Sequence, residues 1–160
     1  MLLAGFAATW LHYRLRVPLR MPGRHGLEFM LIVMGARYLS NMRLASTFTV
    51  TGSIVAALVP GFGFTDPILP YVYVGMGLLI DFAWYRWHKI LVWVPVAAML
   101  GGLVYSLIPI SRIVFFSLSG YMYGTFSAGY IVPILTHIAF GFIGALAGVG
   151  LASGIKKIKK

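Results

Sequence analysis

Residues 130–153 read YIVPILTHIAFGFIGALAGVGLAS, an apolar run without a single Asp, Glu, Lys or Arg. A helix that crosses the hydrocarbon core of a bilayer needs about 20 such residues, so the run is long enough to span it. Residues 90–110, ILVWVPVAAMLGGLVYSLIPI, form a second uncharged run of similar length. Both runs are therefore predicted to be transmembrane helices.

The composition of the whole chain also points to a membrane. Of its 160 residues, 60% are hydrophobic and only 10% are charged, against about 25% charged in ordinary soluble domains. A chain this short has too small an interior to bury so much apolar surface. This excludes a soluble enzyme, a nucleic-acid-binding domain and a disordered chain. The net charge of +10 comes from basic residues between and after the apolar runs, where anionic lipid headgroups attract them.

Shorter apolar segments precede the two long runs, at 1–13, 27–40, 44–60 and 68–85. Loops are expected between several of them, at 14–26 and 60–67, which are rich in Gly and Pro, and at 86–89. Residues 111–129 are rich in Ser, Gly and aromatics, and we expect there a structured loop with a short interfacial helix, or part of a further helix. The prediction is an all-α integral membrane protein, with residues 1–160 forming one transmembrane domain, a bundle of about six transmembrane helices.

The basic residues predict the topology of this bundle. The lysines of the KKIKK tail belong on the cytoplasmic side, and six spans then place the N-terminus there too. These lysines are Lys156, Lys157, Lys159 and Lys160. The loop at 14–26 falls on the outer side although it holds Arg14, Arg16, Arg20 and Arg24. It is either a lid that attracts an anionic ligand or a contact with anionic lipid or a neighbouring protein.

Two opposite charges lie inside predicted helices, Arg37 in 27–40 and Asp81 in 68–85. Both come near the cytoplasmic half, where an unpaired charge costs several kcal/mol. We expect an Arg37–Asp81 ion pair, either as a clamp between helices or as a coupling element read by a cytoplasmic partner. Asp81 has an alternative partner in Arg86 or His88 at the interface.

Polar and aromatic residues gather at the predicted outer ends of the helices. They are His25, Glu28, Tyr71, Tyr73, Tyr105, Thr136 and His137, with Tyr121, Tyr123 and Tyr130 in the preceding loop. Aromatic walls with a few polar groups are typical of a small-molecule pocket, although each tyrosine alone also suits the aromatic belt of a membrane protein. Glu28 and His137 need partners inside a bundle, so a substrate-binding pocket on the outer side is predicted, with Glu28, Tyr73 and His137 as ligand contacts.

No catalytic signature is present. The chain has no cysteine and only three acids, Glu28, Asp66 and Asp81, which nearly excludes a metal held by a cluster of carboxylates. We therefore expect neither an enzyme nor a resident cofactor or metal. A haem held by His12 and His137 is one alternative, and a small lipid-modifying enzyme with His137 or Glu28 as its base is another.

Small residues recur at a spacing of four, as at Ala4 and Ala8, at 97–102 and at 144–148. This spacing lets helix backbones approach closely in lipid. In the last two helices it predicts packing within the bundle. On the short first helix it predicts a patch that faces another protein.

The chain resembles the S component of energy-coupling factor (ECF) transporters in three features. These are the six short helices, the first loop with its VPLRMPGRHG stretch at 17–26, and the glycine-rich end at 137–154. The resemblance implies a binding subunit for a vitamin-like micronutrient in the inner membrane of a prokaryotic cell, with both termini cytoplasmic. It further implies capture outside, a pocket closed by the first loop, and docking on a transmembrane coupling subunit driven by two ATPase subunits. Ala4 and Ala8 match the family's docking patch.

The chain departs from part of that family pattern. The N-terminal histidine ligands of the nickel and cobalt members are absent, which argues against a metal as substrate, and the ligand stays open. The alternative function is a haem- or quinone-binding membrane anchor subunit of a respiratory complex.

Overall fold

The computed structural model describes residues 1–15, 21–59, 66–126 and 129–158. Within these ranges the chain is helical and contains no strand, which confirms the predicted all-α class. The elements are α1 (Leu2–Leu15), α2 (Gly26–Leu39), α3 (Ala45–Ala57), α4 (Leu69–Leu91), α5 (Val94–Tyr105), α6 (Leu107–Ser119), the 3₁₀ helix η1 (Gly124–Phe126) and α7 (Ile131–Ile158). Arg16, Arg20, residues 60–65 and the last two lysines lie outside the described residues.

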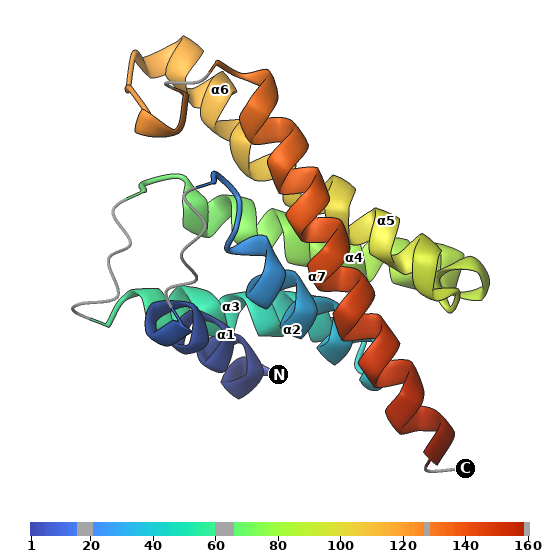
Figure 1. The fold of residues 1–160 in the computed structure, drawn as a ribbon. Coiled ribbons are helices and arrows are strands. Elements are labelled where there is room, and N and C mark those ends of the chain that lie inside the picture. The colour runs from blue at the N-terminus through green and yellow to red at the C-terminus, as the bar shows by residue number, and fades with distance from the viewer. Residues whose placement is uncertain (16–20, 60–65, 127–128, 159–160) are drawn as a thin grey trace.

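The long helix α7 organises the bundle, with α2 packed along one part of it and α5 along another (Figure 1). Glycines make these contacts close. A Cβ on Gly148 would overlap the Leu31 carbonyl of α2, and a Cβ on Gly101 of α5 would overlap Ala145 of α7. The recurring small residues of the last two long runs therefore serve packing inside the molecule, as predicted.

Helix α1 packs against α3 in the same way. Gly5 and Gly52 bring the two backbones together, and Ser53 Oγ donates a 2.8 Å hydrogen bond to the Gly5 carbonyl. Ala8 is fully buried in this contact, while Ala4 is half-buried. The expected surface patch of Ala4 and Ala8 is therefore not found at Ala8, because the small face of α1 is used by α3.

The predicted loop at 86–89 is helical in the structure, and in 111–129 the alternative of part of a further helix is confirmed for much of the stretch. Helix α4 continues through 86–89 to Leu91, with non-helical dihedral angles only at Trp87 (φ −125°, ψ 33°), since no Gly or Pro interrupts this stretch. Much of 111–129 belongs to α6, which ends where Gly120 takes a left-handed conformation (φ 71°). Its serines do not break the helix, because Ser119 Oγ bonds back to the Phe115 carbonyl and so satisfies itself within the helix.

Two stretches are long and apolar enough to cross a membrane. They are the end-to-end pair α5–α6 (Val94–Ser119, 26 residues) and α7 (28 residues). The helices α1, α2 and α3 have 14, 14 and 13 residues, and α4 has 23 residues but carries Asp81, Arg86 and Lys89. By length and composition alone, fewer helices qualify as spans than the six that the sequence predicts.

Candidate functional site

A tight turn at residues 23–26 sets the start of α2. Gly23 has a positive φ of 81°, and its carbonyl accepts a 2.8 Å hydrogen bond from the Gly26 amide. The turn places His25 just before the helix and Glu28 in its first turn, where a carboxylate interacts favourably with the helix dipole. The buried side of α2, including Phe29 and Val33, then carries Glu28 into the molecule.

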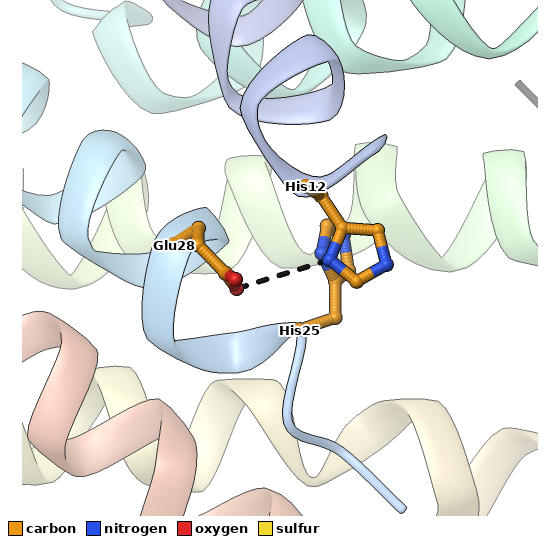
Figure 2. Close-up of side chains that lie close together, drawn as sticks. All are labelled: His12, His25 and Glu28. Atoms are coloured by element: carbon orange, nitrogen blue, oxygen red, sulfur yellow. Dashed lines mark ion pairs between the residues drawn. The ribbon is translucent and has the colours of Figure 1, made fainter. Parts of the chain in front are cut away.

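His12, His25 and Glu28 form one cluster at the end of α1 and the start of α2 (Figure 2). Nδ1 of His12 lies 3.9 Å from Oε2 of Glu28, and the two imidazole ring centres are 4.1 Å apart. One ligand atom from each residue lies within 4.8 Å of the others. Glu28 is almost fully buried, whereas the His12 side chain is 34% exposed. The cluster is therefore accessible from the His12 side.

The polar atoms of this cluster lack hydrogen-bond partners among the described residues. Nδ1 of His12, both ring nitrogens of His25 and Oε2 of Glu28 are buried and form no hydrogen bond, although Nδ1 of His12 and Oε2 of Glu28 face each other at 3.9 Å. Burial, reinforced by the neighbouring His12, His137 and Arg24, lowers the pKa of His25 to about 3, so its imidazole is neutral at physiological pH. A buried polar group without a hydrogen-bond partner costs about 1–3 kcal/mol. A bound group that supplied partners to these atoms would remove this cost.

An aromatic group lies directly behind the cluster. Phe29 stacks on Tyr73 at 4.6 Å between ring centres, and Tyr105 stacks on His137 at 5.1 Å. All four side chains are buried, and they come from α2, α4, α5 and α7. Nδ1 of His137 lies 2.6 Å from the Pro133 carbonyl, which fixes the ring by a hydrogen bond.

The turn at 23–26 covers this aromatic group. A Cβ on Gly23 would come within 2.7 Å of Nδ1 of His137, and a Cβ on Gly26 would overlap the Tyr105 ring. The backbone of the turn therefore lies flat on His137 and Tyr105. Of the seven pocket residues expected from the sequence, the structure brings together His25, Glu28, Tyr73, Tyr105 and His137.

Tyr71 and Thr136 do not belong to this site. Tyr71 is 79% exposed, because it lies two residues before Tyr73 and so faces another side of α4. Thr136 donates a 2.9 Å hydrogen bond to the Val132 carbonyl of its own helix. His12 was expected only as a haem ligand. Its place at the end of the first helix, just before the loop that leads to His25, was the signal for its position here.

The loop tyrosines form a separate group around the end of α6. Tyr123 donates a 3.3 Å hydrogen bond to Asp66, and Asp66 in turn forms a 2.7 Å ion pair with Arg112. Burial and the Asp66 carboxylate raise the pKa of Tyr123 to about 12. Four aromatic residues, together with Met122 and Gly124, line a cavity of about 260 Å³: Phe116, Tyr123, Phe126 and Tyr130. This group adjoins the site around His137, because Arg112 is close enough to interact electrostatically with Tyr105 and His137.

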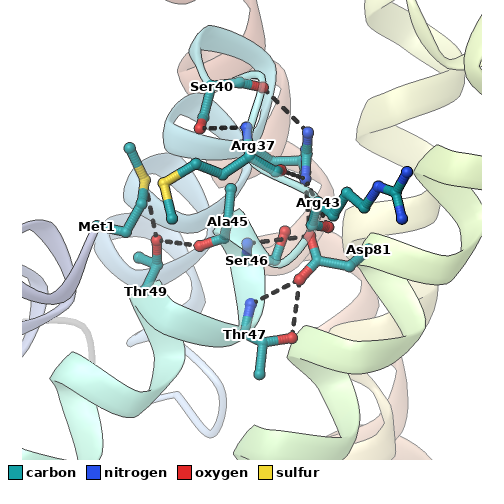
Figure 3. Close-up of polar contacts among 10 residues, drawn as sticks. Met1, Arg37, Ser40, Arg43, Ala45, Ser46, Thr47, Thr49 and Asp81 are labelled. Atoms are coloured by element: carbon teal, nitrogen blue, oxygen red, sulfur yellow. Dashed lines mark hydrogen bonds and ion pairs between the residues drawn. The ribbon is translucent and has the colours of Figure 1, made fainter.

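A third polar group contains the expected ion pair. Arg37 Nη1 lies 3.0 Å from Asp81 Oδ1, and both side chains are almost fully buried. Asp81 also accepts hydrogen bonds from the amides of Ser46 and Thr47 at the start of α3, and from the Thr47 hydroxyl. Figure 3 shows this arrangement, in which Arg37 extends to the chain that follows α2. The pair thus binds α2, α3 and α4 together.

Arg37 also closes the end of its own helix. It donates hydrogen bonds to the carbonyls of Ser40, Met42 and Arg43. Its guanidinium lies 5.5 Å from the Trp84 ring centre, where a cation–π interaction adds to the pair. These contacts fix the end of α2 and join it to Trp84 of α4.

Comparison with protein-family models, curated proteins and solved structures found no match for this chain.

Proposed function

We propose that the chain is the substrate-binding membrane subunit of an importer of the ECF type. In this proposal it captures a small vitamin-like molecule on the outer side of a prokaryotic inner membrane. A transmembrane coupling subunit and two ATPase subunits then complete transport. The observation that carries the proposal is the convergence of His25, Glu28, Tyr105 and His137 at one turn, with Tyr73 stacked on Phe29 behind it. Both ring nitrogens of His25 and Oε2 of Glu28 lack hydrogen-bond partners among the described residues.

The helix directions support an outer position for this site. With α5 and α6 counted as one span, the helices make six, and both termini then lie on the cytoplasmic side. In this topology the end of α1 and the starts of α2, α4 and α7 lie on the outer side, whereas Tyr105, the last residue of α5, lies partway along the α5–α6 span. The outer ends supply His25, Glu28, Tyr73 and His137. The Arg37–Asp81 pair then lies toward the cytoplasm, together with Lys156.

A membrane environment accounts for the exposed apolar surface. Side chains such as Leu3, Leu58, Phe82, Leu103 and Leu151 are each more than half exposed, and a soluble monomer rarely exposes apolar surface so widely. The helices α1 to α3 extend only about 20 Å at 1.5 Å per residue. The proposal therefore includes a locally thinned bilayer around them.

The test is native mass spectrometry of the protein purified in mild detergent and then offered a panel of vitamins. We expect an adduct of one small molecule, weakened by Tyr73→Phe and by His137→Ala. The matched controls are Tyr71→Phe and Thr136→Ala, which alter neighbouring side chains outside the site and should leave the adduct unchanged. Bare protein with every vitamin, or equal losses in the controls, would contradict the proposal.

The same sample tests the alternative of a respiratory anchor subunit. Haem would appear as an adduct of its own mass and as a Soret absorbance band. A quinone would appear as a lipid-like adduct. Either result would replace the importer proposal.

A further inference from the structure

We propose that His12, His25 and Glu28 form a binding site for one divalent transition-metal ion. The sequence alone predicts no such site, because its three residues are separated by a loop and include a single acid. The proposal does not rest on the importer function, since a resident ion at this place would serve a protein of any function.

The ligand set fits this class of ion. Two imidazole nitrogens and one carboxylate oxygen are the donors that Zn²⁺ and its neighbours Co²⁺ and Ni²⁺ prefer. Ca²⁺ and Mg²⁺ require mainly oxygen ligands, and this cluster offers one carboxylate only. Three protein ligands leave a fourth position for water or a small anion.

The distances fit after small side-chain movements. Zinc–ligand bonds of about 2.0–2.2 Å place two ligand atoms of a tetrahedral ion roughly 3.3–3.6 Å apart. The His12–Glu28 separation is 3.9 Å, and all three ligand atoms lie within 4.8 Å of one another. The proposal therefore requires side-chain rotations that bring the ligand atoms closer by about 1 Å.

The unpartnered atoms are the second, independent observation. Nδ1 of His12, Oε2 of Glu28 and both ring nitrogens of His25 are buried without hydrogen-bond partners among the described residues. One ion satisfies an atom of each residue at once. The exposed part of His12 gives a hydrated ion access to the cluster.

The ion would have a structural consequence for the turn above the aromatic group. His12 belongs to α1, whereas His25 is part of the turn that covers His137. Metal binding therefore ties α1 to this turn and holds it over Tyr105 and His137.

The test is titration of the chelator-treated, full-length protein with Zn²⁺ by calorimetry, using a purification tag without histidine. We expect one Zn²⁺ per chain and a rise in Tm on binding. His12→Asn and Glu28→Gln should each weaken the affinity about tenfold or more. His88→Asn is the matched control, because His88 is an exposed histidine far along α4, and it should bind as the unaltered protein does.

A second measurement keeps the proposal open to refutation if the variants do not fold. Co²⁺ bound to the unaltered protein should give the intense visible absorption of a four-coordinate site, and Zn²⁺ should abolish it whereas Mg²⁺ should not. Absence of saturable Zn²⁺ binding, a six-coordinate Co²⁺ spectrum, or equal affinity in Glu28→Gln would overturn the proposal. Loss of vitamin binding would not affect it.

Discussion

Replacing Asp81 with Asn tests whether the buried ion pair holds three helices together. The substitution removes the counter-ion of Arg37 and leaves one side-chain oxygen where the carboxylate accepts four hydrogen bonds. Breaking one partner of a buried pair costs about 3–5 kcal/mol. Arg37 retains the carbonyls of Ser40, Met42 and Arg43, so we expect a loss near the lower limit, about 3 kcal/mol.

This loss can be measured as thermal unfolding in detergent, followed by near-ultraviolet circular dichroism. At about 2–4 °C per kcal/mol for a chain of this size, Tm should fall by roughly 6–12 °C. Asp66→Asn is the matched control, because the Asp66–Arg112 pair is more exposed, with side-chain exposures of 11% and 18%. Its Tm should fall less.

A double-mutant cycle separates the pair from its surroundings. Arg37→Met combined with Asp81→Asn should cost less than the sum of the two single changes, since the second change removes a charge already without its partner. An unchanged Tm for Asp81→Asn, a fall no larger than that of Asp66→Asn, or strict additivity in the cycle would refute the clamp.

Two further predictions concern packing and pH. Gly148→Ala should destabilise the bundle by about 2 kcal/mol or more, as in other overpacked cores, because its Cβ would overlap the Leu31 carbonyl of α2. Gly150→Ala should be neutral, because a Cβ at that position would have nothing within 4 Å. The Tm values of the two variants check this prediction. In metal-free protein the pKa of His25 is lowered from 6.5 to about 3. Below pH 6.5 the unfolded chain therefore binds a proton that the folded chain does not. The free energy of unfolding should decrease by up to about 1.4 kcal/mol for each unit by which the pH is lowered. Unfolding measured between pH 7.5 and 5 should show this fall, and His25→Asn should reduce it; an equal fall in the variant would contradict the assignment.

The sequence predicted the contacts of a residue best where a large energetic penalty limits the surroundings that the residue can have. Arg37 and Asp81 are opposite charges in apolar helices, and the penalty for leaving either unpaired predicts their contact. Glycine spacing in the last helix likewise predicts close packing, and the structure places Gly148 against α2.

Rotation of helices about their axes was not predictable in the same way. Tyr71 and Tyr73 look equivalent in the sequence, yet one is 79% and the other 1% exposed. The outcome depends on which face of α4 meets α2. The same holds for Ala8, whose small side chain suits a partner protein and an internal neighbour equally well.

The His12–His25–Glu28 cluster required the tertiary structure. The order of the helices places the end of α1 on the same side as the start of α2, but nothing local indicates that His12 and Glu28 turn toward each other. The sequence leaves open whether 111–129 is a loop with a short helix or part of a further helix. Serines usually favour turns, but Ser119 satisfies its hydroxyl within the helix, so the helix continues to Gly120.

The placement of Asp81 gives the bundle a mechanical asymmetry. At one end, the Asp81 carboxylate of α4 forms an ion pair with Arg37 of α2 and accepts hydrogen bonds from the start of α3, so that it holds the three helices together. At the other end, the same α2 and α4 meet through the stacked rings of Phe29 and Tyr73, and a ring pair contributes less than a buried, hydrogen-bonded ion pair. A force that spreads α2 and α4 should therefore separate Phe29 from Tyr73 first, while the contacts of Asp81 still hold the opposite ends together.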